Sequence, residues 1–387
     1  MPWTISSGLF CGGIHMEEKY MSMAIELAKK ACGYTNPNPM VGAVIVKDGQ
    51  VLGKGYHTRC GCLHAEREAL KDCQYRGVTV TGATMYVTLE PCCHYGKTPP
   101  CTEAIIENGI AKVVVGSLDP NPKVAGKGIQ ILKDHGIDVV TGVMEKECDD
   151  LNEVFMHYIK NKKPFVVMKY AMTADGKIAT RTGKSQWITG PEARGQVHKD
   201  RHRYAGIMVG IGTVLADDPT LNCRLEDGLS PTRIICDTSL RIPMDSNIVR
   251  TAKTYDTIIA TRSKDNEKIR KLKEAGCQIL VQDGQADRID LVDLMDKVGS
   301  MGLDSVLLEG GGQLNWSALE AGIVNKVQVY VGNKIFGGND AKSPVGGYGV
   351  DLPDQAKRLK LTGLEKFGPD LLIEYRVENE VVECSQG

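Results

Sequence analysis

The sequence "TLEPCCHYGKTPPC", residues Thr88 to Cys101, contains three cysteines, one histidine, one lysine and three prolines. Proline lacks the backbone N–H that a helix interior or a central strand needs, so we predict a loop in this segment. A loop that brings thiol and imidazole groups so close together is typical of a metal site. A second short stretch, "HAE" at His64 to Glu66, adds an imidazole and a carboxylate upstream.

The two stretches together predict a zinc site. Zinc favours four tetrahedral ligands, and a catalytic site keeps one of them as water. His64, Cys92 and Cys101 would supply the other three, because each lies at the end of a predicted helix or strand, where side chains from adjacent elements converge. Helix N-termini also favour the thiolate form of cysteine. Glu66 is then placed to carry protons from a zinc-activated water, whose pKa falls to about 7, to a leaving amine.

Two other interpretations of these residues remain. His64 is also suited to capping a helix beside incidental cysteines. A closed structural zinc site would instead use four protein ligands. Cys93 is the available fourth ligand, but adjacent residues rarely bind one ion together without strain. The combination of "HAE" with "EPC" and a further cysteine favours the hydrolytic site over both.

Strand-like and helix-like segments alternate along the chain, which indicates an α/β fold with a mainly parallel sheet. In the first half we expect a hairpin at 41–53, further strands at 83–90, 111–117 and 137–143, and helices at 16–32, 64–73, 102–109, 128–136 and 145–161. The second half repeats the alternation and ends in two strand-like runs, 359–368 and 370–377. The polar segment "NKKPF" at 161–165 separates the halves. We therefore expect domains at 16–160 and 161–387, preceded by a leader or extension at 1–15.

Composition limits the class of protein. A chain of 387 residues is long enough for two cores. Its net charge of −1 argues against a protein that mainly binds nucleic-acid backbone, and no apolar run reaches the roughly 18 residues needed to cross a membrane. Thirteen cysteines without a secretory signal favour a reducing cytoplasm over a disulfide framework.

The segment "LLEGGGQLNWSAL" at 307–319 suggests a phosphate site in the second half. A buried strand, Glu309, three glycines and a helix follow one another, so that a phosphate can approach both the backbone and a helix N-terminus. The spacing is not G-x-G-x-x-G, so a dinucleotide-binding Rossmann unit is not indicated. A plain tight turn explains the same glycines.

Longer motifs resemble one known family across both halves. "NPMVGAVIV" at 38–46, "HAE" and "EPCCHYGKTPPC" resemble the deaminase domain of the bifunctional riboflavin-biosynthesis deaminase/reductase. The eight residues between Cys92 and Cys101 match this branch and differ from the P-C-x-x-C of most zinc deaminases. "KYAMTADGKIAT" at 169–180, "SQWITG" at 185–190 and "VGIGTVLADDPTLNCR" at 209–224 resemble its reductase domain.

The resemblance, which runs from about Met16 to the C-terminus, implies a fold and an activity. The fold would be a cytidine-deaminase-like α/β/α domain followed by a dihydrofolate-reductase-like α/β domain. The activity would be hydrolytic deamination of 2,5-diamino-6-(5-phosphoribosylamino)pyrimidin-4-one, then reduction of its ribosyl group to ribityl phosphate. Zn²⁺ and NADPH would be the cofactors. The partners would be the phosphorylated pyrimidine and a further copy of the chain, with no nucleic acid and no membrane.

The resemblance also implies roles for individual residues. In the first half it marks as substrate contacts Asn38, His57, His94, Lys97, Asp119 and Asn121. In the second half it marks as NADPH contacts Ala171, Trp187, Thr213, Asp217, Thr238, Gly311 and Gly312. It marks as substrate contacts there Ser185, Arg201, Leu221, Arg224 and Glu309. Lys169 and Glu309 would form a proton-transfer pair near the reacting sugar carbon.

Structural roles compete with several of these assignments. Asn38 before Pro39 is a common turn pair, His57 is compatible with a surface position, and the segment 119–122 with an ordinary loop. Trp187 is compatible with a core position, Asp217 with a helix or turn cap, and Arg201 with a solvated helix face.

Two other functions remain open. One is an RNA or nucleoside deaminase with an unrelated second domain, although the chain shows no basic stripe with interspersed aromatic residues. The other is a binding module in which zinc only holds a loop.

Overall fold

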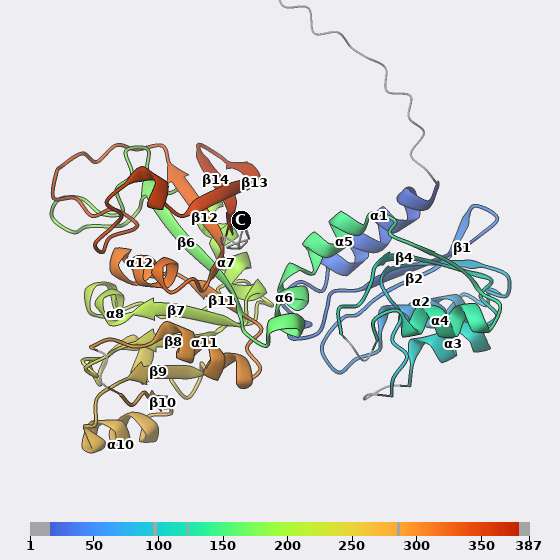
Figure 1. Cartoon of the computed structure of the whole chain (residues 1–387), viewed down its shortest axis with the longest axis horizontal. Coiled ribbons are helices and arrows are strands. Elements are labelled where there is room, and N and C mark those ends of the chain that lie inside the picture. Colours follow the sequence, from blue (N-terminus) through green and yellow to red (C-terminus); the bar gives the residue numbers. More distant parts are fainter. Residues whose placement is uncertain (1–15, 96–98, 122–123, 285–286, 379–387) are drawn as a thin grey trace, which may run out of the picture. The chain divides into compact units, whose positions relative to one another are not determined.

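The computed structural model describes residues 16–95, 99–121, 124–284 and 287–378 (Figure 1). The expected leader at 1–15 and the expected substrate contact Lys97 therefore lie outside the described residues. The chain divides into two compact units between Met156 and His157. Within the described ranges, the helices are too short or too polar to cross a membrane.

The sheet of the first unit has five strands, in the order β2-β1-β3-β4-β5. The strands are β1 (Gly42–Lys47), β2 (Gln50–Tyr56), β3 (Thr84–Leu89), β4 (Lys112–Ser117) and β5 (Asp138–Thr141). β1 is antiparallel to β2 and β3, whereas β3, β4 and β5 are parallel. Four of the five strands thus run in one direction, as the prediction of a mainly parallel sheet requires, and β1 runs the opposite way. The predicted hairpin causes this reversal: its residues Asp48 and Gly49 both have positive φ angles (51° and 75°).

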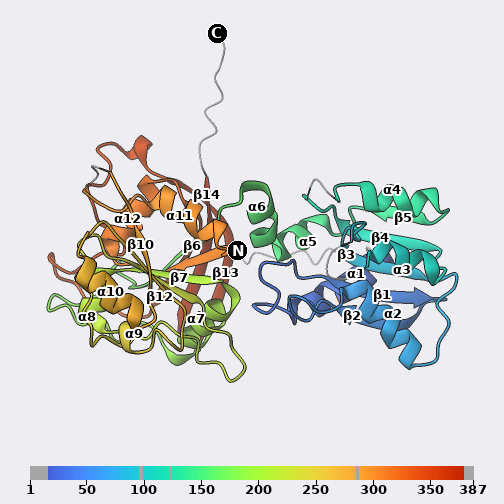
Figure 2. The same ribbon diagram turned by 90° about the horizontal axis from the view of Figure 1, so that it is seen from below.

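Helices cover both faces of this sheet (Figure 2). They are α1 (Met16–Lys29), α2 (Ala65–Tyr75), α3 (Cys101–Glu107), α4 (Lys127–Asp134) and α5 (Glu145–Leu151). On β1, Ala43 and Ile45 pack towards α2, α3 and α4, and Val44 and Val46 pack towards α1 and α5. This alternation follows from the two-residue period of a strand. The unit is an α/β/α sandwich, as predicted.

Helix α2 lies unusually close to β2 because a glycine faces it. A Cβ atom on Gly55 would lie 2.3 Å from the Ala69 nitrogen and 2.4 Å from the Ala65 oxygen. Only a glycine on the strand and small alanines on the helix permit this approach. The N-terminus of α2, with His64 and Glu66, is thereby held directly against the sheet.

The predicted helix at 145–161 is two helices, α5 and α6 (Glu153–Asn161). They break at the buried Asn152, whose Oδ1 accepts the Met40 N–H (2.8 Å) and whose Nδ2 donates to the Met40 carbonyl (2.9 Å). The amide side chain thus pairs with a backbone that is 112 residues away. The helical periodicity of the sequence contains no signal for this long-range pairing.

The second unit has a nine-stranded sheet, in the order β10-β9-β8-β7-β11-β6-β12-β14-β13. The strands are β6 (Phe165–Thr173), β7 (Gly206–Gly210), β8 (Thr232–Cys236), β9 (Thr257–Thr261), β10 (Gln278–Val281), β11 (Ser305–Leu308), β12 (Val324–Gly332), β13 (Arg358–Phe367) and β14 (Asp370–Glu378). The first seven strands in spatial order are parallel to one another. β14 pairs antiparallel with β12, and β13 pairs antiparallel with β14. The two strand-like runs predicted at the C-terminus are therefore confirmed.

Helices also cover both faces of this second sheet. They are α7 (Pro191–Arg203), α8 (Ile211–Asp217), α9 (Asn247–Arg250), α10 (Asn266–Glu274), α11 (Leu291–Ser300) and α12 (Gly312–Glu320). On one face α11 and α12 pack in the same core as Met208 of β7, and on the other α8, α9 and α10 pack with Ile207 and Val209. The parallel strands point their carboxyl ends to one edge, where binding sites of such sheets form.

Candidate functional site

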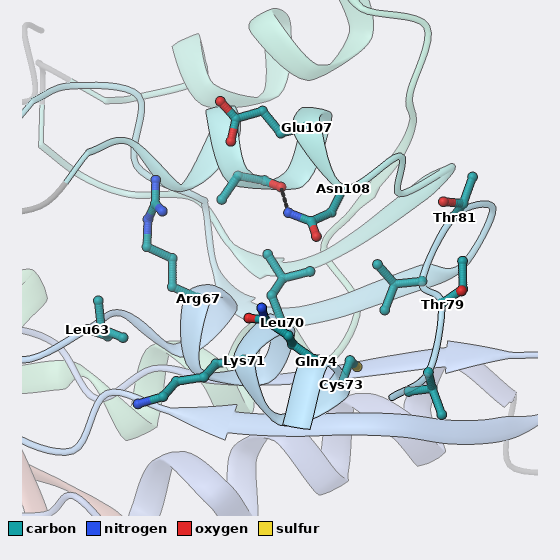
Figure 3. A pocket seen from close by; sticks show the side chains of 13 residues that line it. Leu63, Arg67, Leu70, Lys71, Cys73, Gln74, Thr79, Thr81, Glu107 and Asn108 are labelled. Atoms are coloured by element: carbon teal, nitrogen blue, oxygen red, sulfur yellow. Dashed lines mark hydrogen bonds between the residues drawn. The ribbon is translucent and has the colours of Figure 1, made fainter. Parts of the chain in front are cut away.

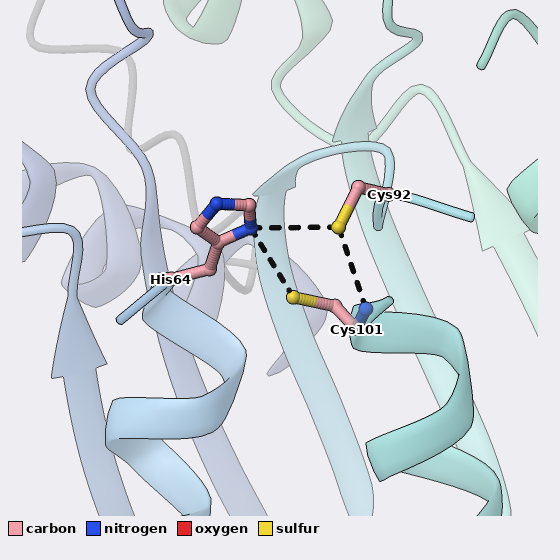
Figure 4. Close-up of side chains that lie close together, drawn as sticks. All are labelled: His64, Cys92 and Cys101. Carbon is pink, nitrogen blue, oxygen red and sulfur yellow. Dashed lines mark hydrogen bonds between the residues drawn. The ribbon is translucent and has the colours of Figure 1, made fainter. Parts of the chain in front are cut away.

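The three predicted metal ligands meet in the first unit (Figure 4). His64 is the N-cap residue of α2, Cys92 follows the end of β3, and Cys101 is the first residue of α3. Nδ1 of His64 lies 3.4 Å from each of the two sulfur atoms. Tetrahedral zinc bonds of about 2.0–2.3 Å place nitrogen and sulfur ligands about 3.5 Å apart, so the donor set fits the ion in both chemistry and spacing.

The N-terminus of α3 acts on Cys92. The backbone N–H of Cys101 donates to the Cys92 sulfur at 3.3 Å. Hydrogen bonds from Cys101 and His64 lower the pKa of Cys92 to about 4, although burial opposes this. The pKa of Cys101 is raised because its thiol keeps its proton and donates a hydrogen bond to the Cys92 thiolate, and because the residue is buried. The helix effect expected from the sequence thus contributes to the low pKa of Cys92, but the Cys101 thiol is the main cause.

Glu66 lies beside the ligands without joining them. Its side chain comes from the first turn of α2, and the residue is only 3% exposed. Burial, and then the negative charge of Cys92, raise the pKa of Glu66 to about 7. A carboxyl group with such a pKa can both accept and release a proton near neutral pH, as the predicted proton carrier must.

Asn38 and His57 lie next to the ligands. The ring of His57 is 5.5 Å from that of His64, centroid to centroid. Nδ1 of His57 is 3.0 Å from the Leu63 carbonyl, which can only accept, so Nδ1 carries the hydrogen and Nε2 accepts from Asn38 Nδ2 at 3.2 Å. Burial lowers the pKa of His57, which keeps this ring neutral. The interpretation of His57 as a surface group is therefore wrong.

Asp119 and Asn121 form a turn near the same ligands. Oδ1 of Asp119 accepts the N–H of Asn121 at 2.8 Å, which is the loop geometry that asparagine and aspartate favour. Burial raises the pKa of Asp119 to about 6, while the charge of His94 opposes the shift and that of Cys92 adds to it. The groups whose charges act on the pKa of Asp119 thus include the predicted substrate contact His94 and the predicted ligand Cys92. His94 itself is exposed.

Two residues that the sequence analysis missed hold the loops around the ligands. Arg67 of α2 donates to the carbonyls of Pro99 (3.2 Å) and Pro100 (2.8 Å), the two residues before Cys101. The carboxylate of Glu90 is buried and accepts backbone N–H groups from the segment that contains Asp119. Arg67 directly follows "HAE" and Glu90 lies within the quoted loop segment, which was the available signal. Their partners lie too far along the chain for that signal to name them.

A groove of about 660 Å³ lies beside α2 and the end of α3 (Figure 3). Its lining includes Arg67, Lys71 and Gln74 of α2 together with Glu107 and Asn108. The predicted site residues that the structure describes do not line it. The groove is therefore separate from the His64, Cys92 and Cys101 cluster.

In the second unit, Glu309 forms ion pairs with two predicted site residues, Arg201 and Lys169. Arg201 of α7 grips its carboxylate with both Nε (2.8 Å) and Nη2 (3.0 Å), and Lys169 Nζ of β6 lies 3.8 Å from Oε2. Burial alone would raise the pKa of Glu309, but Arg201 and Lys169 lower it to about 2. The interpretation of Arg201 as a solvated residue is wrong, because its side chain is only 14% exposed.

Further residues support this charged cluster, and the sequence analysis did not single them out. The ring of Tyr330 lies 5.5 Å from Lys169 Nζ, and its hydroxyl donates to Asp200 Oδ2 at 2.8 Å. Burial raises the pKa of Asp200 to about 6. His198 has a pKa lowered by burial, then by Arg201 and Arg224, so these groups are also near one another.

The segment around Leu221 is held by two arginines. Leu221 has a positive φ of 56°, which non-glycine residues seldom adopt. Arg201 Nη1 donates to the Asn222 carbonyl, and Nη1 of the fully buried Arg233 donates to the Thr220 carbonyl, both at 3.1 Å. The carbonyls on either side of Leu221 are thus fixed by buried guanidinium groups. Arg224 follows with an exposed side chain.

The predicted NADPH contacts lie mainly at one edge of the second sheet. Ala171 is near the end of β6, Thr213 and Asp217 are in α8 directly after β7, and Thr238 follows β8. Gly311 and Gly312 follow β11 and begin α12. Since β8, β7, β11 and β6 are adjacent and parallel, these positions share the carboxyl edge of the sheet.

Trp187 and Ser185 lie in the segment between β6 and α7. The Arg194 guanidinium lies 4.4 Å from the Trp187 ring centroid. Trp187 is 56% exposed, so its interpretation as a core residue is wrong.

Comparisons with known proteins support the family expected from the sequence for both halves of the chain. Residues 14–117 match the family "Cytidine and deoxycytidylate deaminase zinc-binding region", and residues 164–373 match "RibD C-terminal domain". Riboflavin biosynthesis protein RibD of Actinobacillus pleuropneumoniae is 53% identical over 92% of this chain and 94% of its own length. The corresponding protein of Escherichia coli (strain K12) is 37% identical over 92% of this chain and 98% of its own length.

Solved structures resemble the whole chain as well. One is a Thermotoga maritima diaminohydroxyphosphoribosylaminopyrimidine deaminase/5-amino-6-(5-phosphoribosylamino)uracil reductase, with a TM-score of 0.85 and 38% identity over 94% of this chain and 99% of its own. Another is Acinetobacter baumannii RibD, with a TM-score of 0.83 and 35% identity over the same shares.

The ligand set predicts which cysteines retain zinc. Cys92→Ser and Cys101→Ser should each lower the zinc content of the purified chain well below one ion, because each removes a thiolate from the donor set. Cys93→Ser is the matched control, since Cys93 is adjacent but outside the cluster, and it should keep its zinc. Metal analysis by mass spectrometry measures all three. Loss of zinc in Cys93→Ser would show that this sulfur is a ligand.

Proposed function

Because this chain belongs to the RibD family of bifunctional riboflavin biosynthesis proteins, with a zinc-binding deaminase and a reductase that uses NADPH in one polypeptide, we propose specific roles for its two halves. We assign the deaminase to residues 16–160 and the reductase to residues 161–387. We propose that the deaminase converts 2,5-diamino-6-(5-phosphoribosylamino)pyrimidin-4-one. The reductase then converts the ribosyl group of its product to ribityl phosphate.

The deaminase proposal is supported by the geometry around Glu66. His64, Cys92 and Cys101 would hold the zinc ion, which when bound supplies a Lewis acid that makes water nucleophilic near neutral pH. Glu66 carries the two protons of the attacking water, one to the adjacent ring nitrogen and one to the leaving amine, so that the ring carbon becomes a carbonyl and the amine leaves as ammonia. Its pKa of about 7 suits both steps. Asn38, His57, His94, Lys97, Asp119 and Asn121 would bind the pyrimidine and its phosphoribosyl group.

The reductase proposal is supported by the cluster at Glu309. NADPH supplies a hydride for the sugar carbon and would bind at the residues implied above, from Ala171 to Gly312. Lys169, with Glu309 beside it, donates the proton that the sugar oxygen needs when the ring opens. Since the pKa of Glu309 is about 2, this carboxylate stays ionised and holds the two cations in place. Ser185, Leu221 and Arg224 would bind substrate beside Arg201, whose guanidinium group suits a phosphate.

We also propose that the chain forms a homo-oligomer through its edge strand β13. The strand is ten residues long and pairs with β14 on one side. Leu361 and Leu364 on it are 59% and 62% exposed. A long, exposed edge with leucine side chains normally needs a cover, and a second copy of the same strand provides one. We also propose a reducing cytoplasm as the site of action, because the Cys92 and Cys101 thiolates that would hold zinc stay reduced there.

Replacement of the proton carrier tests the deaminase. Glu66→Gln should lower the deaminase turnover at least ~100-fold, because general acid–base catalysis contributes about that much or more. Zinc content and reductase turnover should stay unchanged. Glu68→Gln on the same helix is the matched control and should remain active. Ammonia release from the ribotide measures the loss; wild-type release by Glu66→Gln would refute the assigned role.

Replacement of Arg201 tests the reductase through its pH dependence. The ionised form of Glu309 is the working one, and Arg201 is the main cause of its low pKa. Arg201→Met should therefore raise the pKa of Glu309 by roughly two units, and the acid side of the kcat profile should move to higher pH. Lys199→Met, an exposed change on the same helix, is the control. NADPH absorbance at several pH values measures this; coincident profiles would show that Glu309 does not control the rate.

Sedimentation of the purified chain tests the oligomer. The wild-type chain should sediment as a dimer or larger, and Leu361→Asp with Leu364→Asp should shift it towards the monomer, because buried aspartates at an interface are costly. Met301→Asp changes another exposed apolar residue and should leave the mass unchanged. A monomeric wild-type chain would contradict the proposal.

A further inference from the structure

Glu90 connects two parts of the deaminase that are far apart in the sequence. It lies between the end of β3 and Cys92, and it is only 3% exposed. Its Oε2 accepts the backbone N–H groups of Asp119 (3.3 Å) and Gly126 (2.9 Å). Its Oε1 lies near those of Gly128 (3.1 Å) and Ile129 (3.4 Å). Both carboxylate oxygens are thus occupied by one distant segment.

These contacts replace a missing helix cap. The first N–H groups of a helix have no partner within it, and a side chain at the N-cap position usually accepts them. The N-cap residue of α4 is Gly126, which has a positive φ of 81° and no side chain to accept a hydrogen bond. The carboxylate of Glu90 takes that place, and the positive end of the helix dipole favours its charge.

A close backbone contact fixes the same two parts from the other side. A Cβ atom on Gly128 would lie 2.3 Å from the Pro91 carbonyl oxygen and 3.2 Å from Glu90 Oε1. The first turn of α4 therefore lies directly against the residue that precedes Cys92. A side chain at position 128 would force the helix away from the metal ligands.

We infer that Glu90 is a positioning residue for substrate binding by the deaminase. It holds the segment that begins at Asp119 at a set distance from Cys92, and so sets the position of Asp119 and Asn121 relative to the metal ligands. This inference rests on the proposed role of those two residues as substrate contacts. Glu90 acts through the backbone and does not touch the substrate.

Two variants break this link from opposite sides. Glu90→Gln removes the charge and turns one of the two acceptor oxygens into a donor that opposes backbone N–H groups. Gly128→Ala pushes the start of α4 away from Pro91. Each should raise the KM of deamination ~10-fold or more, with a smaller effect on kcat. Zinc content should not change. Reductase turnover of the same purified chain should also be unchanged, and it reports on the integrity of the second unit.

Glu103→Gln is the matched control. Glu103 is a carboxylate of α3 that accepts from the Tyr95 hydroxyl at the surface, and its replacement should leave the KM as it is. Unchanged KM in both Glu90→Gln and Gly128→Ala would overturn the inference. Zinc loss in parallel with the activity would also overturn it, because Glu90 would then serve the fold of the metal loop instead.

Asp119→Asn separates this inference from the function on which it rests. If Asp119→Asn raises the KM but the two positioning variants do not, only the role of Glu90 fails. If Asp119→Asn leaves the KM unchanged, the proposed substrate contact fails, and the role of Glu90 fails with it. A raised KM in all three variants supports both.

Discussion

The deaminase site depends on the hydrogen bond between the Cys101 N–H and the Cys92 sulfur. It joins the end of a strand to the start of a helix, so the two thiols and the histidine at the start of α2 are brought to one point. The pKa of Cys92 is low mainly because the Cys101 thiol donates a hydrogen bond to it, and this backbone hydrogen bond adds a smaller contribution. The close approach of α2 to Gly55 adds the third ligand and Glu66 to that point. The positions of the metal ligands and the low pKa of Cys92 thus both follow from the contact between the end of β3 and the N-termini of α2 and α3.

The two halves use buried charge in opposite ways. In the first unit, Glu66 is buried without a cation close enough to outweigh burial, and its pKa rises to about 7. In the second unit, the side chain of Glu309 is also largely shielded, at 13% exposed, but Arg201 and Lys169 hold its pKa at about 2. One carboxyl group can therefore exchange protons near neutral pH, while the other is a fixed anion. Neighbouring charges decide which role a buried carboxyl group takes.

Local patterns in the sequence predicted the order of strands and helices, the hairpin, and the placement of the metal ligands at element ends. These features depend on periodicity and on residues close together in the chain. Features that depend on distant partners were not predictable. Asn152 divides a helix by pairing with Met40, and Arg201 pairs with Glu309 across 108 residues. The antiparallel pairing of β1 with β3 likewise depends on which strands become neighbours.

The cluster around Glu309 contains the cations Lys169 and Arg201 and the carboxylates Glu309 and Asp200. Arg224, near His198, adds a third positive group. A surplus of positive charge attracts a phosphorylated molecule over several ångströms before contact. Dissolved ions weaken such attraction over about 10 Å at 0.1 M salt. Capture of the ribotide by the reductase half should therefore slow as ionic strength rises, even where the chemistry of hydride delivery is unaltered.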